Sequence, residues 1–209
     1  MQKNLGFIFN SNFKFSKQIS STVKNSFFHL RLLAKIKPYL PIKQFETVIH
    51  AFITSRLDYC NALYYGIDLS SLKRLQLVQN SAARLLTGTK KRNHITPVLA
   101  SLHWLPVKYR IDFKILLFAF KSINGLAPSY LTDLVKRYDP PRALRSADQS
   151  LLTPYPDLTL ITRGDRAFAV AAPELWNNLP LHVKTAQSLD IFKSRLKTYL
   201  FSQAFTITS

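Results

Sequence analysis

Residues 16–36 read SKQISSTVKNSFFHLRLLAKI, and this stretch decides the fold class of the 209-residue chain. Its apolar residues recur every three or four positions, which places them on one side of an α-helix: they are Ile19, Val23, Phe27, Leu30 and Leu33. Ser16 is a favoured N-cap residue, and Pro38 and Pro41 interrupt the pattern after Ile36. The segment therefore predicts a long amphipathic helix that needs partners for its apolar side.

Two further segments show the same period. The second helix should follow Pro41 and fade near Asp58, with these residues inward: Phe45, Val48, Ile49, Phe52 and Ile53. The third should run from a Ser70 cap to a C-terminal glycine, Gly88, with these residues inward: Leu72, Leu75, Val78, Ala82 and Leu85. Three amphipathic helices with short links predict a small helical bundle over residues 16–93.

A strand or hairpin is expected before the bundle, within residues 1–15. Residues 5–9 form a short β-rich run, and the polar Asn10-Ser11-Asn12 that follows is typical of a turn. Phe13 and Phe15 are the candidate return strand. A hairpin of two short strands is only marginally stable in isolation.

Residues 94–138 should form a second helical region. Proline is well tolerated in the first turn of a helix, and three prolines stand at expected helix starts: Pro97, Pro106 and Pro128. The central helix should cover about residues 107–124, with these residues aligned: Tyr109, Phe113, Leu116, Leu117 and Phe120. Gly125 should close it.

The remainder is predicted to be a linker followed by a terminal helical segment. Residues 139–164 are rich in proline and hold at most a short hairpin near residues 158–162. Within residues 165–209 we expect a short turn around Trp176 and a last helix capped by Ser188, with these residues inward: Leu189, Phe192, Leu196 and Leu200. The predicted fold class is therefore mainly α.

The charge balance of the chain is strongly basic. Lys and Arg number 29 against 11 Asp and Glu, a formal net charge of +18. Eight lysines and arginines precede the first acid, Glu46, and a second acid-free interval separates Asp68 from Asp112. Such an excess favours a polyanionic partner, although basic residues can also serve only for solubility.

Two rows of basic residues are the candidate binding site. Lys17, Lys24, Arg31 and Lys35 share the side of the first helix opposite its apolar stripe. Lys73, Asn80 and Arg84 form a similar row on the third helix, and a basic loop continues it with Lys90, Lys91 and Arg92. Such rows can follow a phosphate backbone without reading bases. The alternative is a solvated outer side of the bundle.

The aromatic residues are expected mainly in the core. These Phe residues occupy inward positions of the predicted helices: Phe27, Phe45, Phe52, Phe113, Phe120 and Phe192. Trp104 and Trp176 each stand near a Leu-Pro step and should anchor helix corners. Tyr64-Tyr65 is the aromatic pair expected to be partly exposed, where base stacking would be open to it.

The sequence offers no motif typical of catalysis or of cofactor binding. It has no adjacent pair of acids for a two-metal polymerase site, and its five histidines and five glycines lack metal-site and phosphate-loop spacings. Cys60 is the only cysteine, so an internal disulfide is impossible and a reducing compartment fits best. We expect no enzyme activity, no cofactor, no metal and no membrane span, and a nuclear or cytoplasmic rather than secreted protein.

Six motifs occur in this order: Leu57-Asp58-Tyr59-Cys60-Asn61, Gln79-Asn80-Ser81-Ala82-Ala83-Arg84-Leu85-Leu86, Leu102-His103-Trp104-Leu105-Pro106, Gly164-Asp165-Arg166-Ala167-Phe168, Pro173-Glu174-Leu175-Trp176-Asn177-Asn178-Leu179-Pro180 and Phe192-Lys193-Ser194-Arg195-Leu196-Lys197. Together they resemble the region downstream of the polymerase core in reverse transcriptases of LINE-type (jockey-like) non-LTR retrotransposons. The resemblance covers nearly the whole chain. One departure is Asn10, which stands where the family pattern has an acid.

The resemblance implies a role in holding nucleic acid. Residues 1–15 would end the polymerase palm, and residues 16–93 would be a thumb-like bundle that grips template–primer RNA and DNA, next to the rest of the polymerase. The catalytic aspartates of the family lie upstream, so the chain would be a non-catalytic fragment of an RNA-directed DNA polymerase. Two alternatives remain open: a decayed mobile-element relic without present activity, and a protein–protein interaction module built from the helices after residue 94.

Overall fold

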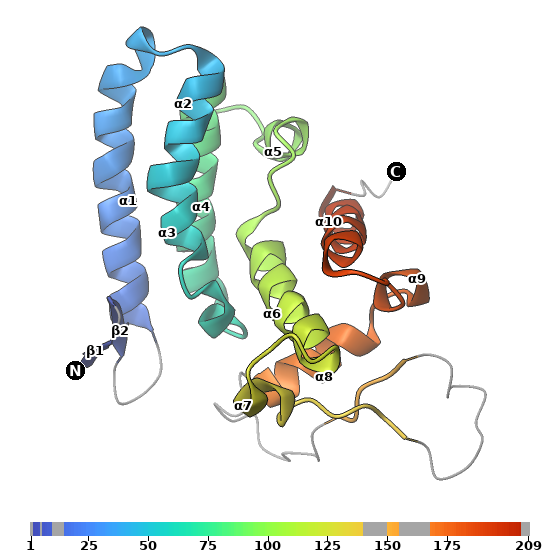
Figure 1. Cartoon of the computed structure of the whole chain (residues 1–209). Coiled ribbons are helices and arrows are strands. Elements are labelled where there is room, and N and C mark those ends of the chain that lie inside the picture. The colour runs from blue at the N-terminus through green and yellow to red at the C-terminus, as the bar shows by residue number, and fades with distance from the viewer. Residues whose placement is uncertain (1, 5, 10–14, 140–149, 155–167, 206–209) are drawn as a thin grey trace. The chain divides into compact units, whose positions relative to one another are not determined.

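A computed structural model of the chain describes residues 2–4, 6–9, 15–139, 150–154 and 168–205 (Figure 1). It is mainly helical, which confirms the predicted fold class. The chain forms two compact units, one of Met1–Arg110 with Ala204–Ser209 and one of Ile111–Gln203. Among the described helices, none combines the length and the apolar content that crossing a membrane requires.

The first unit is built around three helical segments, as the apolar periods predicted. They are α1 (Ser16–Ile36); α2 (Ile42–Ile49) continued by η2 (His50–Thr54) and α3 (Ser55–Asp58); and α4 (Leu69–Thr87). Shorter helices, η1 (Lys37–Tyr39), η3 (Asn61–Tyr64) and α5 (Thr96–Ser101), connect or follow them. The buried side chains of the three segments form one core, which includes Ile19, Leu33, Phe45, Ile49, Ile53, Leu75, Val78 and Ala82.

The second segment contains a π-helical turn that the sequence did not reveal. Residues 50–54 make i→i+5 rather than i→i+4 hydrogen bonds, which shifts the helical phase. Ile49 and Ile53 are both fully buried, whereas Phe52 is 45% exposed. The expectation that Phe52 points inward is therefore wrong, because it assumed an uninterrupted α-helical period.

The first unit begins with a hairpin that contacts α1. β1 (Gln2–Asn4) pairs antiparallel with β2 (Phe7–Phe9), so the partner strand precedes the β-rich run. The expected return strand is wrong, because Phe15 is instead the N-cap of α1, in a left-handed conformation (φ 48°). Phe13 lies outside the described residues. The Phe7 ring lies 5.5 Å from Phe15 and 5.9 Å from Tyr64. Tyr64 is consequently buried, contrary to its expected partial exposure.

The predicted C-terminal glycine of α4 is confirmed, whereas the predicted N-caps of α1 and α4 are wrong. Gly88 ends α4 with φ 73°, as predicted for a C-terminal glycine. The N-cap of α4 is Asp68 rather than Ser70, and its Oδ1 accepts a hydrogen bond from the Ser71 N–H at 2.8 Å. Ser16 is likewise the first residue of α1 and not its cap, which is Phe15.

The second unit contains most of α6 (Val107–Ile123), then α7 (Ser129–Thr132), α8 (Phe168–Asn177), α9 (Leu181–Lys184) and nearly all of α10 (Leu189–Phe205). Its aromatic core stacks Phe120 on Phe192 at 4.2 Å and Trp176 on Phe192 at 5.9 Å between ring centroids. The Ser188 hydroxyl accepts from the Ile191 N–H at 3.3 Å, so the predicted cap of α10 is confirmed.

One feature of this unit differs from expectation, and one expected feature cannot be compared because it lies outside the described residues. Trp176 lies on α8, not in a turn, because the helix continues through Pro173. The hairpin expected near residues 158–162 lies outside the described residues. Within the predicted linker, Leu152 is 1% exposed and is held by the Asn177 side-chain amide, which accepts from its N–H at 2.8 Å and donates to its carbonyl at 2.9 Å.

Candidate nucleic-acid interface

The positive charge of the chain is concentrated in its first half. Residues 1–110 hold 17 Lys and Arg against 3 Asp and Glu, a formal net charge of +14, whereas residues 111–209 hold 12 against 8. The first half therefore carries most of the total of +18, and a polyanion would be attracted mainly there.

Helix α1 carries the first predicted row on its outward side. Lys17, Lys24, Arg31 and Lys35 are all exposed. They lie opposite a buried side made of Gln18, Ile19, Thr22, Ser26, Leu30 and Leu33. Within the part of the chain that the structure describes, no carboxylate lies within ion-pair distance of Lys24, Arg31 or Lys35. Their charges are thus available to an external anion.

The second predicted row, on α4, divides into different roles. Lys73 is exposed, but Asn80 accepts a hydrogen bond from the Gln76 amide at 2.8 Å. Arg84 is half-buried, and its guanidinium donates to the Lys90 carbonyl and, at 2.7 Å, to the Asn93 carbonyl. Arg84 therefore shapes the loop after α4, and its contribution to binding would be through that loop.

The basic loop is held in an exposed position. Lys90, Lys91 and Arg92 are all exposed, and the Asn93 N–H donates to the Lys90 carbonyl at 3.1 Å to close a turn. Because Arg84 binds this loop at both ends of the turn, the three cations are fixed near the C-terminus of α4. The loop is a compact cluster rather than an extension of a straight row.

Arg74 belongs to the α1 surface, although sequence reasoning did not select it. Its Nη2 donates to the Ser20 hydroxyl at 3.0 Å. Ser20 lies one turn from both Lys17 and Lys24, at the i−3 and i+4 positions. The signal was present in the sequence as a second cation beside Lys73, but only the packing of α4 on α1 shows which way it points.

The two helices run in the same direction, so their basic residues can follow one line. Arg74, near the start of α4, meets Ser20 near the start of α1, and the Lys37 ammonium just after α1 donates to the Leu85 carbonyl near the end of α4 at 2.6 Å. The structure thus brings Arg74 to the α1 row. We call Lys17, Lys24, Arg31 and Arg74 the α1 basic surface.

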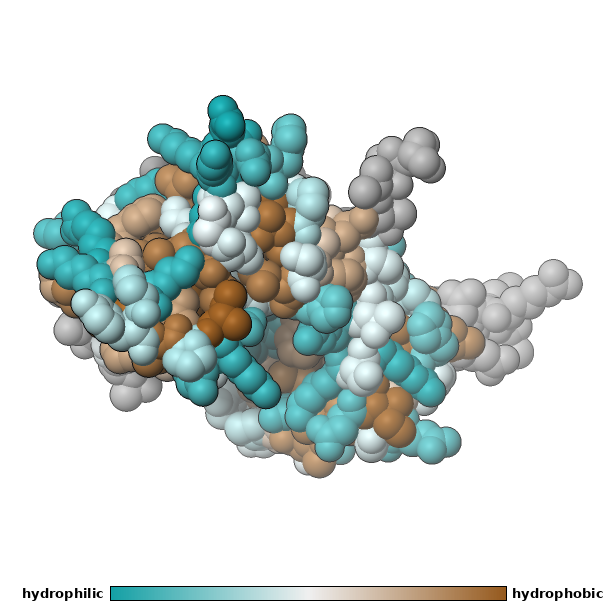
Figure 2. All heavy atoms as spheres, turned by 90° about the horizontal axis from the view of Figure 1, so that it is seen from above, coloured by the Kyte–Doolittle hydropathy of each residue, from teal (hydrophilic) through white to brown (hydrophobic). Residues whose placement is uncertain are grey.

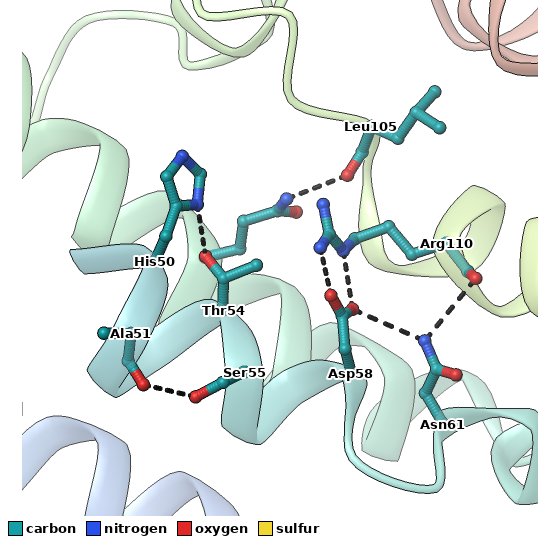
Figure 3. A network of polar contacts seen from close by, with 9 residues as sticks. His50, Ala51, Thr54, Ser55, Asp58, Asn61, Leu105 and Arg110 are labelled. Carbon is teal, nitrogen blue, oxygen red and sulfur yellow. Dashed lines mark hydrogen bonds and ion pairs between the residues drawn. The ribbon is translucent and has the colours of Figure 1, made fainter. Parts of the chain in front are cut away.

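Motif residues of the first unit form an internal polar network together with Arg110 (Figure 3). Arg110 binds the Asp58 carboxylate through two nitrogens, with Nε to Oδ1 at 2.8 Å, and the amide of the buried Asn61 approaches Asp58 Oδ1 at 3.4 Å. Gln79 donates to the Leu105 carbonyl at 2.8 Å. These side chains tie the turn after α3, the middle of α4 and the start of α6 together.

The same network closes the N-terminus of α6. The first N–H groups of a helix have no partner within it. The Gln76 amide oxygen accepts from the Val107 N–H at 2.8 Å, so a side chain of α4 serves as the cap. Trp104, 5% exposed, packs its ring 5.2 Å from that of His50, as expected for an anchor at a helix corner. The motifs therefore have a structural use.

The histidines take part in local contacts. His29 Nδ1 lies 2.7 Å from the Asn25 carbonyl, and His50 Nδ1 lies 3.1 Å from the Thr54 hydroxyl. Among the described residues, no group of three or more His, Cys, Asp or Glu lies close enough together to hold a metal ion.

The second unit contains a cavity of about 160 Å³ beside Trp176. Lys184 and Arg137 line it, together with Tyr138, Ser150 and Leu152. Lys184 is 9% exposed and donates to the Asn177 carbonyl at 3.0 Å; burial lowers the pKa of its ammonium. The residues that line the cavity come from positions 123–184, and none of them belongs to the α1 basic surface.

Comparison with known proteins adds no relative. The chain matches no protein-family model, no curated protein and no solved structure.

Proposed function

We propose that the first unit binds nucleic acid through its phosphate backbone, and that the chain is the thumb-region fragment of a LINE-type non-LTR retrotransposon reverse transcriptase. In this proposal it is a non-catalytic, intracellular protein whose partner is template–primer RNA and DNA. The observation that carries the binding is the α1 basic surface, where three exposed cations share the outward side of α1 and Arg74 of α4 reaches Ser20 beside them.

The arrangement suits backbone contacts better than base readout. Lys17, Lys24 and Arg31 are spaced by seven residues, about 10 Å along the helix axis, and stand on a helix whose other side is packed. Rigid cations of this kind fix the position of a phosphate backbone without reading its sequence. Asp58, Gln79 and Arg110 form hydrogen bonds inside the first unit. This supports the same proposal, since a domain that positions nucleic acid needs a rigid structure rather than a reactive centre.

The test is a charge reversal of the surface. The variant Lys17→Glu, Lys24→Glu, Arg31→Glu should bind a fluorescein-labelled RNA–DNA hybrid about a hundredfold or more weaker at 0.1 M salt, because each phosphate contact contributes roughly 0.9 log unit between 1 M and 0.1 M salt. Anisotropy titrations at several salt concentrations should show a slope reduced by about 0.9 for each phosphate that the variant no longer neutralises. The loss of affinity should be equal for unrelated sequences.

A matched control separates this surface from net charge. The variant Lys43→Glu, Lys136→Glu, Lys197→Glu changes the charge by the same amount at three exposed positions outside the two rows. It should lose much less affinity than the α1 variant. Equal losses for the two variants would reduce the binding to a net-charge effect, and absence of binding to any duplex by the native chain would favour the relic without activity.

A further inference from the structure

The π turn places an aromatic ring on the surface of the first unit. Phe52 would lie in line with Phe45 and Ile49 in an uninterrupted α-helix, on the buried side. In η2 it is 45% exposed, while Ile49 and Ile53 hold the core. π turns are rare in proteins, and those that occur are often found at functional sites, because the extra residue redirects a side chain.

Phe52 belongs to an aromatic group contributed by two helical segments. Its ring stacks on that of His29 with centroids 5.8 Å apart and planes inclined by 23°. Phe28 meets the edge of His29 at 5.5 Å and is 51% exposed. We call Phe28, His29 and Phe52 the aromatic cluster.

The ring of His29 is fixed between two hydrogen bonds. The Asn25 carbonyl accepts from Nδ1, so a neutral imidazole carries its proton there and Nε2 accepts from the Arg56 guanidinium, with 3.3 Å between Nη2 and Nε2. The cationic side chain of Arg56 therefore contacts the aromatic cluster through His29. The central ring is therefore held in one orientation while its two neighbours are half-exposed.

Cations stand directly beside the exposed ring of Phe28. Lys24 lies one turn before it and Arg31 one turn after it on the same side of α1, and both are exposed. The α1 basic surface and the aromatic cluster are thus adjacent. Figure 2 shows that on the face seen from above both hydrophobic (brown) and hydrophilic (teal) residues reach the surface.

Aromatic rings between cations fit a polyanion that carries planar rings of its own. Bases in a duplex are stacked on one another and present only their edges, whereas unpaired bases can stack on a protein ring while their phosphates meet Lys and Arg. A purely apolar partner would not match Lys24, Arg31 and Arg56 around the rings.

We propose that the aromatic cluster stacks unpaired bases of single-stranded RNA or DNA, with the flanking phosphates held by Lys24 and Arg31. The proposal rests on the nucleic-acid binding proposed above and extends it from duplex backbone to an unpaired segment. Phe28 and Phe52 supply the stacking faces, and His29 positions Phe52.

The test compares single strands with duplexes in the same variant. The double variant Phe28→Ala, Phe52→Ala should bind an unstructured 12-nucleotide single strand at least about fivefold more weakly for each base that loses its stacking partner. Its affinity for a 12-base-pair duplex should stay within twofold of that of the native protein. Tyr130→Ala, which removes a 67% exposed aromatic ring from the second unit, is the matched control and should leave both affinities unchanged. Circular dichroism and the melting temperature establish that the variants fold.

A second measurement does not depend on substitution. A single strand containing 5-iodouracil, irradiated on the native protein at long wavelength, should attach to Phe28, His29 or Phe52, as mapped by peptide mass spectrometry. Adducts confined to other residues, or equal losses for single strand and duplex in the double variant, would overturn the stacking but leave the phosphate binding intact. A native protein that binds neither nucleic acid would instead overturn the proposed function.

Discussion

The bidentate pair of Asp58 and Arg110 should stabilise the first unit measurably, and a double-mutant cycle can isolate it. The two side chains are 33% and 22% exposed. The perturbation is Asp58→Ala, Arg110→Ala and the double variant. Each single change removes both hydrogen bonds between the carboxylate and the guanidinium and leaves the partner half-buried.

The magnitude follows from the partial burial. Exposed ion pairs contribute at most about 1 kcal/mol, and breaking a fully buried pair costs about 3–5 kcal/mol. The bidentate geometry strengthens the pair, while water reaches both groups and screens them. We therefore expect a coupling free energy of about 1–2 kcal/mol. Asp58→Ala should cost more than the pair alone, because Asn61 also loses an acceptor.

The assay is urea unfolding followed by the fluorescence of Trp104, which lies in the first unit. All four members of the cycle would carry Trp176→Phe, so that the remaining tryptophan reports on that unit alone. At a typical slope of about 1.5 kcal/mol per molar urea, the coupling corresponds to a midpoint difference of roughly 1 M. Strictly additive effects of the two substitutions, with no coupling above experimental error, would refute the role given to the pair.

Two further predictions concern α4. Hydrogen bonds from the Ser70 hydroxyl and the Ser71 N–H lower the pKa of Asp68 to about 2 from 3.8. The stabilisation of the fold by the ionised Asp68 cap is therefore complete above pH 4 and is lost as the pH falls towards 2. Asp68→Asn keeps a good cap that does not titrate, so the unfolding free energy of this variant should lack this pH dependence. A series of urea titrations between pH 4 and 2 would detect the difference. Gln79→Leu should lower the unfolding free energy by about 1–3 kcal/mol, because the buried Leu105 carbonyl loses its donor, whereas an unchanged urea midpoint would show that this hydrogen bond is replaced by water.

The helices were predictable because each carries its own pattern. Residues 16–36 contain a complete apolar stripe, and α1 has those bounds. Gly88 and Ser188 were predicted as end signals because their roles depend on local backbone geometry. The N-cap of α4 was assigned to Ser70 because two nearby residue types compete for that position, and Asp68 is the one whose carboxylate reaches Ser71.

The failures have two causes, tertiary packing and a local irregularity of a helix. Tyr64 is buried because a hairpin formed by residues distant in sequence covers it. Phe52 is exposed because a π turn adds a residue that no periodic pattern announces. For the candidate site, the exposure of the α1 row was predictable from its period. The addition of Arg74 depended on how α4 packs on α1, which sequence spacing does not contain.

The polar network drawn in Figure 3 has a consequence for how such a sequence changes over generations. Substituting Asp58, Gln79 or Arg110 harms folding whether or not anything binds, so selection against unstable protein alone retains them. Lys24 and Arg31 are exposed and contribute little to the fold, so folding alone does not constrain them. Residues of the first kind are therefore constrained by folding alone, whereas residues of the second kind would be constrained only by the binding proposed above.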